Sequence, residues 1–180
     1  MITSVRNPKV AAALKLHKRA FRERERAFLV EGVQALGEAL SIPGGGISTL
    51  FHTEPSHPLV ERARAGGVAT THVSVDVMAR LAGTVTPQGF VGVAAFLDVP
   101  FDDLPDEQVG VALLHEVRDP GNAGTVLRSA DAVGADAVIF SSSSVDVWIL
   151  ASLVCAGSFF DVRRGPSSSN VGRSEQSGAG

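Results

Sequence analysis

The most informative segment of this chain reads Leu114-His115-Glu116-Val117-Arg118-Asp119-Pro120-Gly121-Asn122-Ala123-Gly124-Thr125-Val126-Leu127-Arg128-Ser129-Ala130. It continues an apolar run from Val111 to Leu114, which is typical of a parallel strand buried on both faces. Pro120 and Gly121 predict a tight turn at the carboxyl end of that strand. Asn122 is then the predicted N-cap of a helix that reaches about residue 133.

The residues after this helix predict a second strand beside the first. Gly134 is a typical helix stop, and residues 136–140 form another apolar run. The segment therefore reads as a β-α-β unit. In open α/β sheets, ligands bind beyond the carboxyl ends of the strands, and the free N–H groups of a helix start attract anions.

Helical periodicity assigns the faces of the predicted helix. Val126, Ala130 and Val133 fall on one side, which we expect to face the sheet. Arg128 falls roughly opposite, one turn after Gly124, so its guanidinium is free to meet a ligand above the helix. Spacing alone favours an ordinary exposed surface arginine, because such residues are common on helices.

The preceding part of the chain predicts a separate α/β sandwich, because strand-like and helix-like runs alternate. The expected strands are 28–32 (a strand or a helix start), 47–52, 68–73 and 90–96, and the expected helices are 33–40, 58–65 and 74–82. Residues 98–108 hold two prolines and five carboxylates, which favours a linker. We therefore expect a domain at 1–97, a linker at 98–109, a second domain at 110–165 and a disordered tail at 166–180.

The N-terminal segment is strongly basic although the whole chain has a net charge of −3. Asn7 and Pro8 predict the start of one amphipathic helix that runs to about Arg26. A basic block on an acidic chain indicates phosphate binding, and a solvated helix face is the alternative. The candidate phosphate-binding residues are Arg6, Lys9, Lys15, Lys18, Arg19, Arg22 and Arg26.

Composition excludes several other classes of protein. Hydrophobic residues make up 44% of the chain and charged residues 19%, which suits a folded core. Cys155 is the only cysteine, so an intramolecular disulfide is impossible and a reducing cytoplasm is favoured. His, Cys and carboxylate residues show no metal-ligand spacing, and the longest apolar stretch, 147–157, is too short for a membrane span. We therefore expect a cytoplasmic protein without a metal site.

The informative segment resembles the first signature motif of the SpoU (TrmH-like) family of RNA 2'-O-ribose methyltransferases. The matching residues are Asp119-Pro120-Gly121-Asn122-Ala123-Gly124, Arg128, Ala130 and Gly134-Ala135-Asp136. Phe28-Leu29-Val30-Glu31-Gly32, Thr86-Pro87-Gln88-Gly89 and the basic N-terminal helix are similar to the family's substrate-binding domain. The resemblance covers roughly residues 4–147.

This resemblance implies a fold, a reaction and a set of site residues. The implied fold is a small α/β RNA-binding domain followed by an incomplete α/β-knot (SPOUT) methyltransferase domain. The implied reaction transfers a methyl group from S-adenosylmethionine to a ribose 2'-hydroxyl of tRNA or rRNA. Arg128 matches the family's catalytic arginine, which acts either as a base or by orienting the RNA phosphate and the nucleophile. Asn122 matches a position that helps to build the active site. Glu116 lies in the same loop and is a further candidate, with an ordinary solvated loop carboxylate as the alternative.

The family pattern breaks after Val147. An Asn-Pro-Lys motif is expected next, but Trp148 is followed by Ile149-Leu150, and the Glu-Gly and Asn loops that hold the adenosine in the family have no counterpart. We therefore expect a C-terminally truncated or frameshifted family member that does not bind S-adenosylmethionine by itself. Full-length relatives form homodimers, and we do not expect this chain to do so. Translating the locus in all three frames tests the frameshift. The alternatives are a non-enzymatic RNA-binding module and, more distantly, an α/β nucleotide-binding protein.

Overall fold

The computed structural model describes residues 1–41, 46–96, 110–135, 137–141, 143–146, 148 and 162–164. Among these, residues 1–96 form a first compact unit together with Asp146 and Trp148, and residues 110–145 form a second unit with residues 162–164. Asp146 and Trp148 thus belong with the first unit, whereas we expected residues 110–165 to form the second domain. The predicted linker and tail lie outside the described residues.

The first unit is built on a mixed four-stranded sheet. Its strands are β1 (Ala27–Glu31), β2 (Ile47–His52), β3 (Ala69–His72) and β4 (Phe90–Ala95), in the order β1-β4-β2-β3. β4 runs antiparallel to both β1 and β2, while β2 and β3 are parallel. The predicted α/β class is confirmed, and every strand expected in this region forms.

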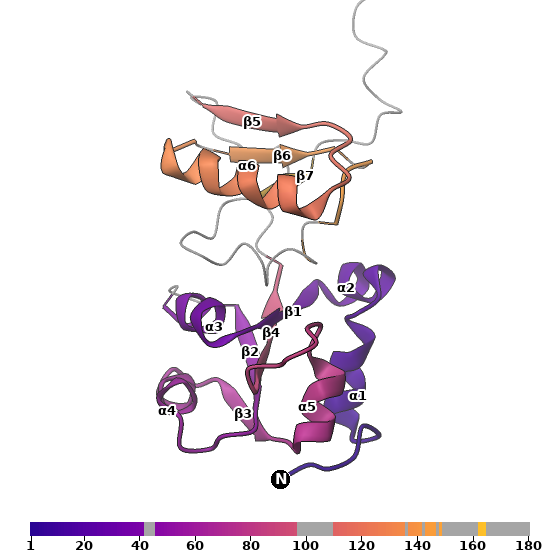
Figure 1. The fold of residues 1–180 in the computed structure, drawn as a ribbon, viewed down its shortest axis with the longest axis vertical. Coiled ribbons are helices and arrows are strands. Elements are labelled where there is room, and N and C mark those ends of the chain that lie inside the picture. Colours follow the sequence, from indigo (N-terminus) through magenta and orange to yellow (C-terminus); the bar gives the residue numbers. More distant parts are fainter. Residues whose placement is uncertain are drawn as a thin grey trace, which may run out of the picture. The chain divides into compact units, whose positions relative to one another are not determined.

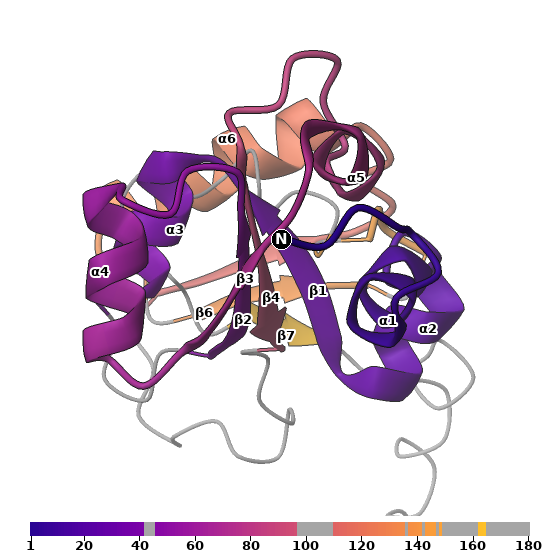
Figure 2. The same ribbon diagram turned by 90° about the horizontal axis from the view of Figure 1, so that it is seen from below.

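Five helices cover the two faces of this sheet (Figures 1 and 2). They are α1 (Pro8–Lys15), α2 (Arg19–Glu25), α3 (Val33–Ala39), α4 (Pro58–Ala65) and α5 (Val75–Leu81). Both views show α3 and α4 on one face and α1 and α5 on the other, with α2 beside β1. The side of the sheet under α1 and α5 holds a buried cluster of Val10, Ala13, Phe51, Val73, Val77, Met78, Leu81 and Val91.

Local sequence explains where these helices begin. The Asn7 side chain accepts a hydrogen bond from Lys9 N ahead of Pro8, and the Ser74 hydroxyl accepts one from Val77 N. His57 caps α4 in the same way through Nδ1. Each cap satisfies a backbone N–H that has no partner inside the helix.

The prediction of one continuous basic helix to Arg26 is wrong. α1 ends at Lys15, Lys18 is extended with φ −96° and ψ 129°, and α2 begins at Arg19. Two backbone carbonyls in the break, those of Leu16 and His17, accept hydrogen bonds from the Arg22 guanidinium. A side chain that lies five to six residues further on therefore stabilises the end of α1.

The second unit contains the predicted β-α-β arrangement. β5 (Val111–Leu114) and β6 (Ala137–Phe140) are parallel, α6 (Pro120–Ala132) connects them, and β7 (Val162–Arg164) pairs with β6 in parallel. β6 is buried along its whole length, as expected. β5 is not, because Val111 and Leu113 are 46% and 67% exposed, so the prediction of a strand buried on both faces is wrong there.

α6 also differs in detail from the prediction. Its N-cap is Asp119, whose carboxylate accepts from Asn122 N at 2.7 Å, so Asn122 lies inside the first turn. The buried side chains are Ala123, Leu127 and Ala130, whereas Val126 and Val133 are exposed. The face of the helix that meets the sheet is thus rotated from the predicted one. Among the described helices, none is long and apolar enough to cross a bilayer.

Candidate functional site

The loop after β5 carries the first group of candidate residues. Glu116 has a left-handed backbone (φ 53°), and its N–H donates to Ser141 Oγ at 3.1 Å. The Ser144 hydroxyl donates to Leu114 O at 3.0 Å, and Val145 N donates to Val117 O at 2.8 Å. The loop is thereby tied to the segment that follows β6. The Glu116 side chain is exposed to solvent.

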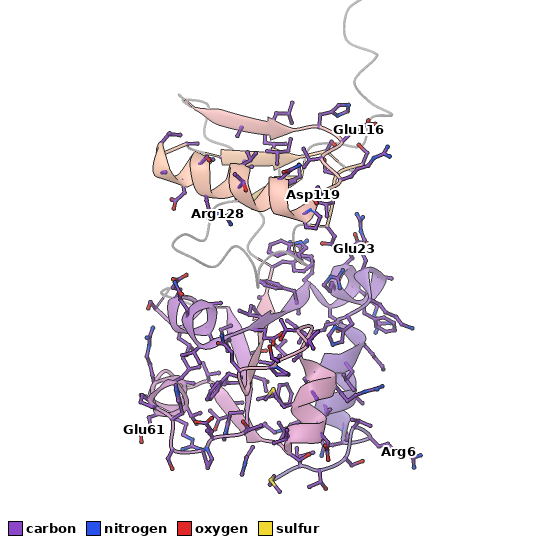
Figure 3. The ribbon with its side chains drawn as sticks, viewed as in Figure 1. Arg6, Glu23, Glu61, Glu116, Asp119 and Arg128 are labelled. Carbon is purple, nitrogen blue, oxygen red and sulfur yellow. The ribbon has the colours of Figure 1, made fainter. Side chains whose placement is uncertain are left out.

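Arg128 lies further along α6 than the loop residues (Figure 3). Its side chain is exposed and donates through Nη2 to Thr125 Oγ1 at 3.2 Å, and the Thr125 hydroxyl donates to Gly121 O at 2.9 Å. Figure 3 shows Glu116 and Asp119 at the end of β5 and Arg128 on the body of the helix. Thr125 therefore fixes the direction in which the guanidinium projects.

The structure does not bring Asn122 and Arg128 onto one face of α6. Six helical residues separate them by roughly 9 Å along the axis and by about 240° around it. Asn122 is exposed in the first turn, close to the loop that holds Glu116. The candidate catalytic residues thus form two groups in this unit: Glu116 and Asn122 near the strand end, and Arg128 alone on the helix.

The basic residues of the N-terminal segment are mostly exposed, as predicted. The exposed members are Arg6, Lys9, Lys15, Lys18, Arg19, Arg24 and Arg26. Several of them lie over aromatic rings: Lys15 Nζ and the Arg24 guanidinium are 5.7 Å and 4.7 Å from the Phe21 ring centroid. Arg19 forms a hydrogen-bonded ion pair with Glu23 at 2.9 Å, and this hydrogen bond raises the pKa of Arg19.

Arg22 is the exception, and the expectation that it lies on the exposed basic face is wrong. Only 4% of the residue is exposed. Its Nη1 donates to the Leu16 and His17 carbonyls at 2.7 Å and 2.8 Å, and its Nη2 donates to Asp146 at 2.8 Å. A guanidinium with these three partners serves the fold, so we remove Arg22 from the candidate RNA-binding residues.

The structure adds residues that the sequence analysis did not select. The Glu31 carboxylate accepts hydrogen bonds from Gly83 N at 2.9 Å and from the Thr84 hydroxyl, and Gln88 Oε1 accepts one from Val33 N at 3.1 Å. These residues line a cavity of about 640 Å³ in the first unit. The motifs Phe28–Gly32 and Thr86–Gly89 contain Glu31 and Gln88, so the signal was present, but spacing along the chain could not show that they meet.

Within the part of the chain that the structure describes, no group of three or more His, Cys, Asp or Glu residues is placed to hold a metal ion. The buried His52 and the half-buried His72 stack with 5.4 Å between their ring centroids.

The known proteins that this chain resembles are RNA methyltransferases. The MRM3-like substrate binding domain matches residues 7–92. The 23S rRNA (guanosine(2553)-2'-O)-methyltransferase RlmP of Bacillus subtilis is 32% identical over 151 residues, which are 82% of this chain and 56% of that protein. An uncharacterised tRNA/rRNA methyltransferase of Synechocystis is 33% identical over 148 residues, 81% of this chain and 54% of that protein. The chain thus spans about half the length of these relatives.

Solved structures agree with the sequence relatives. An rRNA methyltransferase from Sinorhizobium meliloti superimposes with a TM-score of 0.76 at 28% identity, over 91% of this chain and 64% of that one. The SpoU methyltransferase AviRb from Streptomyces viridochromogenes, in complex with AdoMet, gives 0.72 at 25% identity over 90% and 64%. Fold and motif together define an RNA methyltransferase-type α/β protein. More specifically, the chain is similar in sequence and fold to members of the SpoU (TrmH-like) family.

S-adenosylmethionine is the cofactor of this family, as the AdoMet-bound structures show. The described residues of the second unit do not by themselves fit it. The N–H of Asn122 at the start of α6 already donates to Asp119. The hydroxyls of Ser141 and Ser144 are bonded to each other and to the loop backbone. These N–H and hydroxyl groups are thus already hydrogen-bonded within the protein, which leaves them poorly suited to hold an adenosine.

Proposed function

We propose that this chain carries the RNA-binding domain and the substrate-side part of a SpoU-family RNA 2'-O-ribose methyltransferase that acts on tRNA or rRNA. The observation that supports this best is Arg128: it is exposed on α6 and held by Thr125, in the helix that follows the family's first motif. RNA as substrate also suggests the cytoplasm, where tRNA and ribosomes are found, as its location.

Arg128 suits the stabilisation of negative charge better than the removal of a proton. When bound, S-adenosylmethionine supplies an electrophilic methyl group, and the ribose 2'-hydroxyl must lose its proton as it attacks. A guanidinium stays protonated at any physiological pH, so it orients a phosphate or stabilises the developing oxyanion. The exposed carboxylate of Glu116 is the candidate proton acceptor, and the Asn122 amide is a candidate for holding the ribose.

The basic face of α1 and α2 is proposed to hold the RNA backbone. Arg6, Lys9, Lys15, Lys18, Arg19 and Arg26 offer cationic groups to successive phosphates, and such contacts give affinity without sequence preference. Because the adenosine-holding motifs of the family have no counterpart in the sequence, we further propose that methyl transfer by this chain alone is impaired. A non-enzymatic RNA-binding module is the alternative.

Replacing the matching arginine in an active full-length relative tests the catalytic assignment. Arg128→Ala, made at that position, should lower kcat for methyl transfer at least about 100-fold while RNA affinity changes little, because the interaction is made in the transition state. Ser129→Ala, at the neighbouring exposed position of α6, is the matched control and should be nearly normal. Near-normal turnover of the arginine variant would mean that Arg128 is an ordinary surface residue.

A further inference from the structure

A half-enclosed cavity of about 640 Å³ lies in the first unit, on the side of β1 that faces α2 and α5. The described residues that line it all belong to that unit. Part of the wall is apolar and is formed by Leu29, Leu81 and Val91. The volume and the mixture of apolar wall with a few polar groups are those of a site for a small molecule or a single nucleotide.

The polar groups of the cavity come from two distant motifs that the fold brings together. Glu31 lies at the end of β1, and Gln88 precedes β4, which pairs with β1. Gln88 Oε1 accepts from Val33 N at 3.1 Å, which links the two motifs directly. The turn between the two groups requires glycine, because Gly32 has φ +100°, a backbone conformation that residues with a Cβ rarely adopt.

Hydrogen bonds leave defined groups of these two side chains available. Both oxygens of Glu31 are held, one by Gly83 N and the other by the Thr84 hydroxyl. Each carboxylate oxygen accepts more than one hydrogen bond, so the pair still presents two acceptors in a fixed plane. In the part of the chain that the structure describes, Gln88 Nε2 has no hydrogen-bond partner, so it remains a donor in the lining of the same cavity.

We propose that this cavity binds an unpaired guanine base of the RNA. Guanine is the RNA base with two adjacent N–H donors, N1–H and the 2-amino group, which match a carboxylate held in one plane. Its O6 acceptor, next to N1, matches the free donor of Gln88. Adenine places an acceptor at N1 against the carboxylate, and uracil offers a single N–H. Proteins read RNA sequence mainly from such unstacked bases, through their Watson–Crick edges.

This inference rests on the proposed RNA-binding function and adds base selectivity to it. The basic face of α1 and α2 binds phosphates of any sequence, whereas the cavity accepts one kind of base. His17, on the rim, follows the last residue of α1 by two positions, so the cavity adjoins the proposed phosphate-binding surface. The substrate-binding domain would then select a position in the RNA before any chemistry occurs.

The test measures binding of the whole 180-residue chain to short single-stranded RNAs that differ at one base. Each RNA has one guanosine, inosine or adenosine within a run of uridines. Trp148 is the only tryptophan and lines the cavity, so its fluorescence reports occupation of this site. We expect guanosine RNA to bind at least about tenfold more tightly than the inosine or adenosine RNA, because a bidentate base contact discriminates by that much or more.

Two isosteric variants separate base recognition from a structural role. Glu31→Gln should abolish the preference for guanosine while leaving affinity for the adenosine RNA unchanged. Gln88→Glu keeps the Oε1 acceptor for Val33 N but replaces the donor by an acceptor, and it should also lose the preference. Glu61→Gln, on α4, makes the same change in charge away from the cavity and should behave like the wild type (Figure 3).

The outcomes distinguish this inference from the proposed function. RNA binding that depends on salt but ignores the base, or a guanosine preference that survives Glu31→Gln, would overturn the cavity assignment alone. Absence of binding to any of the RNAs would overturn the proposed RNA-binding function as well. Guanosine monophosphate that binds as tightly as the oligonucleotide would show that the site takes a free nucleotide, and would also overturn the RNA assignment.

Discussion

Arg22 lies within the most basic segment of the chain, yet all of its contacts are made inside the protein. Its guanidinium donates a hydrogen bond to the backbone carbonyl of Leu16 at the end of α1 and forms an ion pair with Asp146. Both side chains of this ion pair are 5% exposed. Removal of one partner leaves a buried charge without compensation, which costs far more than loss of an exposed ion pair.

We predict that Arg22→Ala lowers the free energy of unfolding by about 3 kcal/mol or more. The Asp146 carboxylate and the carbonyls of Leu16 and His17 would all lose a donor. Arg6→Ala, at an exposed position of the same basic segment, should change stability by no more than about 0.5 kcal/mol. Urea unfolding of the two variants measures this, and equal stabilities would contradict the structural role.

His52 is the other buried polar side chain with an unusual environment. It is 1% exposed, it stacks on His72, and its Nδ1 has no hydrogen-bond partner among the described residues. Burial lowers the pKa of His52, and the nearby His72 and Arg64 lower it further. The folded state therefore holds this imidazole neutral at pH values at which the unfolded chain binds a proton.

A lowered pKa in the folded state means that stability is lost as pH falls. The unfolded chain takes up the proton below its ordinary pKa of about 6.5, while the folded state does not, so the free energy of unfolding should decrease from pH 7.5 to pH 5.5. His52→Leu should flatten this dependence, whereas His17→Gln, at an exposed histidine, should not. Parallel pH profiles for wild type and His52→Leu would refute the assignment.

At the scale of the element, α1 and α2 present the cationic face that we propose for RNA. The break between them separates Lys15 from Arg19 and turns the two helices relative to each other. The exposed residues therefore do not follow one continuous helical stripe. A phosphate-binding surface needs only cations at suitable spacing, so the break changes which residues to test rather than the proposal itself.

We predict that Lys15→Glu combined with Lys18→Glu weakens binding to single-stranded RNA and reduces the slope of log K against log salt by about one to two. Arg64→Glu combined with Arg80→Glu makes the same change in net charge on α4 and α5 and is the matched control. If both double variants lose equal affinity, net charge rather than a defined face is responsible.

The elements themselves were largely predictable, and the exceptions have local physical causes. Alternating apolar runs located β1 to β4, and β6, within a residue or two. The break at residues 16–18 was not predictable, because Arg22 and Asp146, which stabilise it, are 124 residues apart. The face of α6 was misplaced because Val126 and Val133 are apolar yet exposed. Asp119 was overlooked as the N-cap although Pro120 follows it directly, in the same arrangement as Asn7 and Pro8.

The candidate site residues were predictable from the sequence only where they lie within one continuous segment. Arg128, Asn122 and Glu116 were selected from a single motif, and their separation along α6 and its preceding loop follows from helix geometry. The cavity around Glu31 and Gln88 required the pairing of β1 with β4, which places residues from two motifs side by side. Sequence spacing carries no direct information on such pairings.

At the scale of the whole molecule, the proposed function combines a substrate-binding unit with part of a methyltransferase unit. We predict that isothermal titration with S-adenosylmethionine gives no saturable heat for this chain and a saturable heat for a full-length relative such as RlmP, because the motifs that hold the adenosine have no counterpart here. Binding by this chain with comparable affinity would contradict both the proposed impairment and the RNA-binding-module alternative.

Asp146 and Trp148 pack in the first unit although they follow the second unit in the sequence, which affects how the chain folds during synthesis. Trp148 stacks on Phe96 at 4.1 Å and lies 4.9 Å from the Phe28 ring, and Asp146 neutralises Arg22. A ribosome releases the N-terminal residues first, so Phe28 and Arg22 emerge long before these partners are made. Until both strands β5 and β6 have left the exit tunnel, the Phe28 ring therefore lacks its Trp148 neighbour and the Arg22 guanidinium lacks its carboxylate partner.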